Sequence, residues 1–312
     1  MSDRTIPRLL QTPAVLLLLV WMLVPLSMTL FFSFIRYALN NLRRPEWTTP
    51  DIANWRGFGN YNYVLNNKDF WFAIQNSVLI VASILIITVI LGLAIAVLVN
   101  RSFPGRGIVR VLLISPFFVM PAVNAVLWIN MILDPVLGLN GVAVEGINNM
   151  VAGLKDAPLV GWFFALWPEL RPISFRGTDT SAYAVIMMVA WQWTPFAVLI
   201  FMTSLQSEDE SQKEAATLDG AGPWSQFINL TVPHLARPIA IVVMIQSIFH
   251  LSLYAEIEIV SRGNGNKNLP YLIGEFSSNN IGAASATGIF AVILANIIAI
   301  FLLRMVGKSL MD

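Results

Sequence analysis

The residues best suited to bind a ligand are polar and aromatic side chains inside apolar stretches of the sequence. Gln246, His250 and Tyr254 follow one another in steps of four, so a continuous helix would place them on one face. Amide, imidazole and hydroxyl groups form hydrogen bonds with a hydroxyl-rich ligand, and aromatic rings offer flat faces to it. Hydrogen bonding between helices explains Gln246, His250 and Gln192 equally well. Four further candidates lie in other stretches or just beyond the stripe: Asn124, Gln192, Trp193 and Glu256.

Catalytic and metal-binding motifs are missing from the sequence. His234 and His250 stand 16 residues apart without an E-x-x-H arrangement, and the chain contains no cysteine. Gly307-Lys308-Ser309 resembles the end of a phosphate-binding loop, but Leu302 stands where that loop requires its first glycine. We therefore expect no catalytic residue, no metal, no cofactor and no ATP chemistry on this chain. An integral membrane enzyme is disfavoured for the same reason.

The composition places these residues in a membrane protein. Of 312 residues, 56% are hydrophobic and 12% are charged, and the mean hydropathy is +0.69. Soluble domains carry about 25% charged residues, so this chain has too few charges to cover a surface that faces water. A net charge of +1 provides no basic patch. The composition argues against a soluble globular protein, a disordered chain and a protein that binds nucleic acid.

Six windows without Asp, Glu, Lys or Arg divide the chain, and five of them exceed the roughly 20 residues that cross a bilayer. The fifth window, Pro238–Ala255, is shorter and is extended by Ile257, Ile259 and Val260. The first window is too long for a signal peptide and is taken as a retained helix. We expect an all-α integral membrane protein with one transmembrane domain over residues 1–312. The predicted spans are residues 9–35, 72–100, 110–133, 182–206, 238–260 and 283–304.

The basic residues of the loops predict the orientation of these spans. The short loop between the second and third spans holds Arg101, Arg106 and Arg110 and no acidic residue, and such loops stay in the cytoplasm. Both termini should therefore be cytoplasmic. Two long loops, Arg36–Asp69 and Asp134–Asp179, then lie outside. They are long enough to hold short helices that dock a partner, although a simple tether explains them equally well.

The predicted cytoplasmic loop 208–237 differs from the rest of the chain. Acidic residues at 208–210 suit the first turn of a helix. Gly220 and Gly222 then end that helix, with a positive φ expected at Gly220, and Pro223 suits the first turn of a second helix. Pro233 and Pro238 end this segment. The pattern predicts a rigid helix-turn-helix that another protein can approach at Ala215-Ala216, or else a solvated connector helix.

The same loop resembles the EAA loop of permease subunits in binding-protein-dependent ABC importers. The matching residues are Glu214-Ala215-Ala216, then Gly220, then Leu230, Val232 and Pro233, with Leu230 and Val232 replacing Ile and Leu. Asp219-Gly220-Ala221 resembles the sugar-transporting branch. Further stretches resemble carbohydrate permeases of the maltose-transporter type, most closely those for sorbitol and mannitol: Leu23–Tyr37, Gly57–Tyr61, Ser115–Pro121 and Trp191–Pro195. The loop Asp134–Asp179 is longer than expected for that subgroup.

The resemblance implies a six-helix permease of the type I ABC importer architecture in the bacterial cytoplasmic (inner) membrane. It implies four kinds of partner: a second homologous permease, two ATPase subunits, a periplasmic or lipid-anchored binding protein, and a small carbohydrate such as a polyol. The residues it assigns to contact with the ATPase are Glu214, Ala215, Ala216, Asp219, Gly220, Ala221 and Pro233. ATP hydrolysis would then occur on the partner ATPase.

Two other kinds of transport stay open. The permease could serve a different solute, such as an amino acid or a modified or phosphorylated sugar. A secondary transporter would normally show inverted repeats or buried acidic residues for ion coupling. All six windows lack acidic residues, and only Glu256 and Glu258 lie at the end of one, so this class is less well supported.

Overall fold

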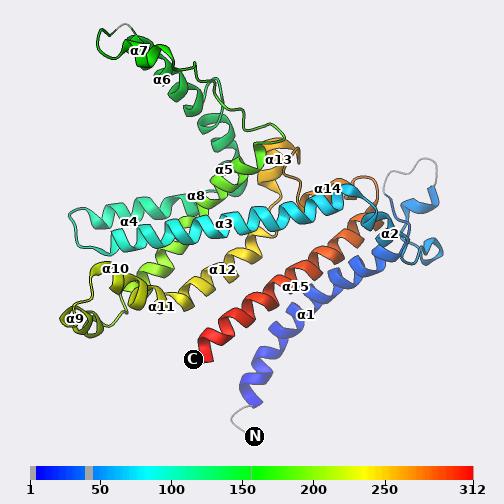
Figure 1. Cartoon of the computed structure of the whole chain (residues 1–312). Helices are drawn as coiled ribbons and strands as arrows, with labels where there is room; N and C mark the ends of the chain where they lie inside the picture. The colour runs from blue at the N-terminus through cyan, green and yellow to red at the C-terminus, as the bar shows by residue number, and fades with distance from the viewer. Residues whose placement is uncertain (1–4, 39–44, 156, 312) are drawn as a thin grey trace. The chain divides into compact units, whose positions relative to one another are not determined.

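The computed structural model describes residues 5–38, 45–155 and 157–311, and these residues form helices joined by turns and loops. The described residues contain no β-strand beyond an isolated bridge between Ile35 and Trp55. The chain divides into two compact units, Met1–Ile74 with Leu269–Asn296, and Gln75–Asn268 with Ile297–Asp312. Figure 1 labels the helices. The predicted all-helical fold is confirmed.

The first unit is built around the ends of three long apolar helices. Its core consists of aliphatic and aromatic side chains on α2, α3, α14 and α15, including the fully buried Val64, Ala73 and Leu272. Within the chain, helix α1 buries none of its most apolar window. The elements are α1 (Thr5–Phe34), η1 (Pro45–Thr48), η2 (Ile52–Asn54), α2 (Gly59–Leu65), the start of α3 (Lys68–Asn100), α14 (Leu269–Ser277) and the start of α15 (Ile281–Met311).

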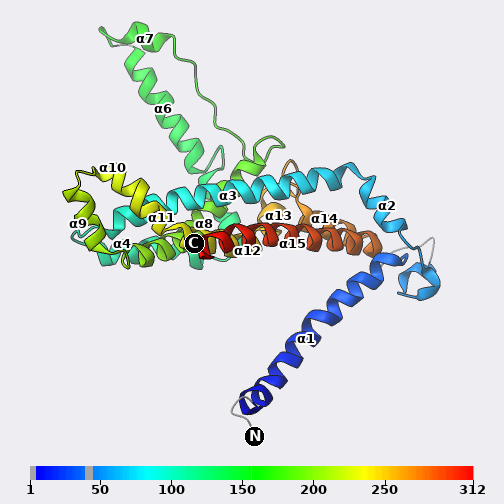
Figure 2. The same ribbon diagram turned by 60° about the horizontal axis from the view of Figure 1, so that its bottom comes forward.

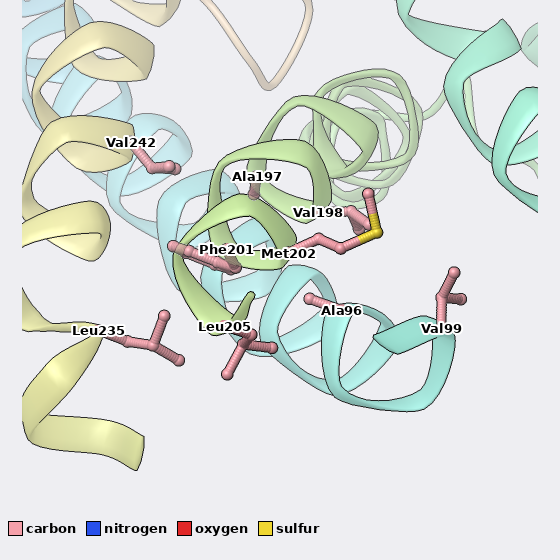
Figure 3. Close-up of a cluster of buried hydrophobic side chains, with 9 residues drawn as sticks. All are labelled: Ala96, Val99, Ala197, Val198, Phe201, Met202, Leu205, Leu235 and Val242. Atoms are coloured by element: carbon pink, nitrogen blue, oxygen red, sulfur yellow. The ribbon is translucent and has the colours of Figure 1, made fainter. Parts of the chain in front are cut away.

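The second unit packs around α8, the most buried of the long helices. Gly92 of α3 lets α8 approach, because a Cβ there would lie 2.7 Å from the Cβ of Ala197. Figure 3 shows the surrounding core: Ala96, Val99, Ala197, Val198, Phe201, Met202, Leu205, Leu235 and Val242. Besides the rest of α3, the elements up to α8 are α4 (Arg106–Ile114), η3 (Ser115–Phe118), α5 (Pro121–Leu127), η4 (Trp128–Ile132), α6 (Leu139–Lys155), α7 (Gly161–Ala165) and α8 (Ser181–Leu205).

The elements that follow α8 are α9 (Glu210–Leu218), α10 (Pro223–Gln226), the π-helical turn η5 (Phe227–Thr231), α11 (Val232–His234), α12 (Ala236–His250) and α13 (Ala255–Ser261). Figures 1 and 2 show α9 and α10 beside the C-terminal end of α3. The loop Asp134–Asp179 carries two helices of its own, α6 and α7. In both views these helices project away from α3 and α8. Asn148 of α6 holds the returning chain by exchanging two hydrogen bonds with the backbone of Leu170.

Four described helices are long and apolar enough to cross a membrane: Leu10–Phe34, Lys68–Asn100, Ser181–Leu205 and Ile281–Arg304. Two bent pairs qualify only when each is taken as one span. Arg106–Phe118 and Pro121–Ile132 meet at 102°, and Pro223–His234 and Ala236–His250 meet at 55°. The structure therefore contains four to six candidate spans.

Two predicted spans are not continuous helices in the structure. Residues 110–133 break before Pro121, which starts α5 because proline has no N–H to continue the preceding helix. Residues 238–260 break after His250, where α12 ends, and helix resumes at Ala255.

Candidate functional sites: an exposed helical loop and a buried polar cluster

The loop 208–237 begins with a well-capped helix. Asp209 is the N-cap of α9, and its carboxylate accepts a hydrogen bond of 2.9 Å from the backbone N–H of Ser211. Hydrogen bonds from the Ser211 side chain and backbone lower the pKa of Asp209. The negative charge is therefore retained near the helix N-terminus, where the helix dipole favours it. The acidic start of this helix predicted from the sequence is confirmed.

The turn after α9 depends on the backbone conformation of Gly220. Its φ is +82°, as expected, and its N–H bonds to the carbonyl of Thr217 at 3.0 Å. The N–H of Ala221 reaches the carbonyl of Ala216 at 2.9 Å, which completes a Schellman cap. Gly222 then caps α10, and Pro223 is its first residue. The predicted helix, sharp turn and second helix are present.

Side-chain contacts across the loop hold its two limbs together. Gln226 donates to the hydroxyl of Thr217 and to the carbonyl of Ala221, both at 2.9 Å. The Glu208 carboxylate accepts from the Thr231 hydroxyl at 2.9 Å and pairs with the Lys213 ammonium at 2.9 Å.

Glu208 takes part in two of these contacts, with Thr231 and with Lys213. Its side chain is only 5% exposed, and it connects the start of α9 with η5. Our sequence reasoning missed Glu208 and Gln226 as cross-links, because no local spacing indicates that position 231 folds back onto position 208.

The loop presents a surface on which another protein can dock. Leu218 is 88% exposed and Trp224 is 73% exposed, so two large apolar side chains face outward from a rigid segment. Of the residues that the resemblance assigned to ATPase contact, Ala216 and Ala221 are half-buried, and the others are exposed: Glu214, Ala215, Asp219, Gly220 and Pro233. All seven therefore lie on or next to the free surface of the loop.

A second group of predicted residues lies buried between α5, α8 and α12. Asn124 of α5 donates to the side-chain oxygen of Gln192 at 3.0 Å and to the carbonyl of Met188 at 3.2 Å. The Gln192 amide in turn donates to the carbonyl of Val119. Both side chains are at most 3% exposed. These bonds join α5 to α8, so the helix-to-helix alternative describes Gln192 in this structure.

Gln246 has the same kind of environment. Its side-chain oxygen accepts from the Thr88 hydroxyl at 2.8 Å, and its amide donates to the carbonyl of Trp193 at 3.3 Å. It is fully buried, so α12 is hydrogen-bonded to both α3 and α8 at this point. In this structure Gln246 therefore forms hydrogen bonds between helices.

His250 differs from its neighbours in the cluster. It is 1% exposed, and among the described residues neither ring nitrogen has a hydrogen-bond partner. The Oδ1 atom of Asn124 likewise has none among them. The His250 ring meets Trp193 edge-on at 5.0 Å. Unpaired buried polar atoms cost free energy unless a ligand or water satisfies them, so these atoms are the candidate ligand contacts.

The predicted stripe of three residues is wrong at its outer member. Helix α12 ends at His250, and Tyr254 is the residue before α13, with φ −134° and ψ −54°. Tyr254 is 43% exposed and does not share a helix face with Gln246 and His250. Glu256 lies in the first turn of α13 and is 5% exposed. Helix α13 packs against α5, so Glu256 belongs to a helix that adjoins the one carrying Asn124.

Within the described part of the chain, no group of three or more His, Cys, Asp and Glu side chains is arranged to hold a metal ion. A helical membrane protein with a polar cluster among its helices and a rigid exposed loop has the features of the membrane subunit of a transporter. Comparison with known protein families identifies the kind of transporter. Residues 88–312 match the binding-protein-dependent transport system inner membrane component family, and the chain belongs to this family.

Individual relatives cover nearly the whole chain. The inner membrane ABC transporter permease protein YcjO of Escherichia coli K12 is 28% identical over 301 residues, which is 94% of this chain and 93% of the relative. The trehalose transport system permease protein SugA of Mycobacterium tuberculosis is 23% identical over 99% of this chain and 91% of its own length. The trehalose/maltose transport system permease protein MalF of Thermococcus litoralis is 26% identical, covering 86% and 82% respectively.

A solved structure shares the fold. One chain in the crystal structure of a bacterial alginate ABC transporter, in complex with a periplasmic protein that holds an alginate pentasaccharide, aligns with a TM-score of 0.70. The sequence identity is 19%, and the alignment covers 96% of this chain and 93% of the other. The resemblance to ABC importer permeases and the type I fold that it implied are confirmed. The family is a transport component of the inner membrane and not an enzyme.

Proposed function

We propose that this chain is one of two permease halves of an ATP-driven importer for a small sugar, with a polyol as the preferred substrate. Its relatives are named as permeases for trehalose, maltose and lactose. The observation that carries the proposal is the loop 208–237. It combines a Schellman-capped turn, buried cross-links and an exposed apolar surface inside the part of the chain that matches the family.

The proposed role of this loop is to couple the membrane helices to an ATPase subunit. Leu218 and Trp224 provide apolar contact area, while Glu214 and Ala215 provide an exposed face that a partner groove can approach closely. The loop continues into α12 through α11, so a displacement of the docked loop is passed to the helix that carries Gln246 and His250. The orientation that this role requires places both termini in the cytoplasm.

The proposed substrate contacts are the unsatisfied atoms of the buried cluster. A sugar hydroxyl can donate to one nitrogen of His250 or to Oδ1 of Asn124, and the aromatic face of Trp193 lies beside His250. Gln192 and Gln246 hold the surrounding helices in this arrangement, and Tyr254 and Glu256 belong to the segment around α13. The remaining proposed partners are a second permease, two ATPase subunits and a binding protein that delivers the sugar.

Co-expression tests this function. The chain is tagged, expressed with a candidate ATPase, second permease and binding protein from the same organism, and reconstituted in vesicles with the binding protein outside. We expect both other membrane-associated subunits to co-purify, and sugar uptake to require ATP inside. Screening the binding protein against polyols and neutral disaccharides identifies the substrate. Uptake driven by an ion gradient without ATP would contradict the proposal, as would failure of any ATPase to co-purify.

A further inference from the structure

A polar cavity of about 490 Å³ lies in the first unit, where α1, α2 and the start of α15 meet, and its residues have no part in the function proposed above. We call it the α1–α2 cavity. Its lining is mostly polar and includes Arg36, Arg56, Glu46, Trp47, Asn279 and Asn280. A volume of this size suits a small molecule or a headgroup better than a protein surface.

Two guanidinium groups, those of Arg36 and Arg56, line the cavity. The Arg36 guanidinium lies over the ring of Trp47 at 5.3 Å, and among the described residues it has no hydrogen-bonding or ion-pair acceptor. Arg56 donates one hydrogen bond of 3.0 Å, to the side-chain oxygen of Asn60. Neither arginine is paired with a described carboxylate.

The surrounding backbone holds Arg56 in place through Asn60. Asn60 is fully buried, and its amide donates to the carbonyls of Ser33 at 2.9 Å and Ile35 at 2.8 Å. Gly282 of α15 packs against the same frame, because a Cβ there would lie 2.6 Å from both Asn60 Nδ2 and Ile35 O. Arg56 is therefore anchored through a fixed amide, and its remaining N–H groups are available to a ligand.

The cavity lies next to the end of the α1 span. That span ends at Phe34, whose ring stacks on Trp55 at 5.3 Å and meets Phe58 edge-on at 5.5 Å. Trp55 and Phe58 are 56% and 75% exposed. An exposed tryptophan at the end of a span is typical of the boundary between membrane and water, which favours a position of the cavity at the depth of phospholipid headgroups.

We propose that the α1–α2 cavity binds a phosphate carried on a small hydroxylated group, as in glycerol phosphate. Guanidinium groups bind phosphate oxygens through two parallel hydrogen bonds, and Arg36 and Arg56 both line the cavity without a described carboxylate partner. The Asn279 amide suits the hydroxyl groups. The glycerol phosphate headgroup of an anionic phospholipid and free glycerol phosphate share this chemistry.

Binding measurements on the full chain in nanodiscs separate these two sources. In phosphatidylcholine nanodiscs, sn-glycerol 3-phosphate is titrated by calorimetry, with glycerol as the comparison. In nanodiscs containing phosphatidylglycerol, native mass spectrometry measures the lipid retained by the protein. We expect binding in at least one arm, and Arg36→Gln and Arg56→Gln each to weaken it at least tenfold. Binding in the first arm alone identifies a free solute, and retention in the second alone identifies a lipid.

Lys68→Gln is the matched control, since Lys68 is an exposed basic residue of the same unit that does not line the cavity. We expect it to bind like the wild type. Arg36→Lys keeps the charge without the planar fork and should weaken binding by less than Arg36→Gln, so it tests the site even if the glutamine variants fail to insert. The proposal is overturned if neither phosphate source is preferred over glycerol or phosphatidylcholine. It is also overturned if the arginine variants bind normally, or if Lys68→Gln weakens binding as much as they do.

Discussion

Two glycines in the exposed loop show how the backbone angle φ determines whether a position requires glycine. Gly220 has φ +82°, and Gly222 has φ −69°. A Cβ at either position would meet no atom within 4 Å. The space around the two residues is therefore equally open, and only Gly220 needs the left-handed conformation that other residues adopt at a cost.

Alanine substitutions at these two positions give a matched pair of variants. We expect Gly220→Ala to destabilise the end of α9 by about 1–2 kcal/mol and Gly222→Ala to have little effect. Hydrogen exchange of the α9 amides measures this difference. Gly220→Val should still insert in the membrane but lose substrate-stimulated ATPase activity in the assembled transporter. Wild-type coupling in Gly220→Val would remove the turn from the coupling mechanism.

His250 allows ligand contact to be separated from helix packing. The substitution His250→Phe keeps an aromatic ring beside Trp193 and removes two buried nitrogens that have no described partner. We expect stability to be unchanged or increased, because no hydrogen bond within the described chain is lost. Uptake should need up to about tenfold more substrate-loaded binding protein, since a sugar hydrogen bond contributes about 0.5–1.5 kcal/mol.

Thr88→Val is the contrasting variant, because it removes a bond between α3 and α12. We expect it to lower thermal stability and subunit co-purification. If His250→Phe takes up sugar with wild-type kinetics, His250 is not a substrate contact.

At the level of elements, the breaks in two predicted spans determine which residues meet. The bend of 102° between the two segments before and after Pro121 directs α5 toward α8 and α13. The break after His250 removes Tyr254 from the helix face of Gln246. Side chains that share a face in a straight helix are therefore divided between two segments here.

Glu208 is predicted to maintain the shape of the loop. Glu208→Ala removes the acceptor for Thr231 and the partner of Lys213, so we expect a loss of about 1.5–3 kcal/mol of local stability. The consequence is faster hydrogen exchange in α9 and ATPase activity that no longer responds to substrate. Glu210→Ala is the control, because Glu210 lies two residues later and is exposed. Equal effects of the two substitutions would show that only the acidic charge matters.

At the level of the whole molecule, the orientation in the membrane is the main remaining prediction. The chain contains no cysteine, so a single introduced cysteine can be labelled without background. We expect Ser102→Cys to react only from the cytoplasm, because the adjacent turn carries three arginines and no acidic residue. Asn66→Cys should react only from outside. Labelling of Ser102→Cys from outside would reverse the orientation and separate the loop 208–237 from the ATPase.

The class of this protein could be predicted from the sequence alone, because apolar windows, the basic segment Arg101–Arg110 and the pattern from Glu214 to Pro233 are local signals. The length of an apolar window predicts a span, and glycine and proline predict turns, because both signals act within a short segment of the chain. The positive φ at Gly220 and the helix starting at Pro223 were predictable for this reason.

Contacts between distant residues were decided only by the tertiary structure. The Glu208–Thr231 bond, the pairing of Thr88 with Gln246 and the isolation of His250 depend on which helices pack together. A polar residue in an apolar window looks the same in the sequence whether it forms a hydrogen bond to a neighbouring helix or contacts a ligand. The two cases differ in whether a partner lies within hydrogen-bonding distance, and that distance depends on how the helices pack.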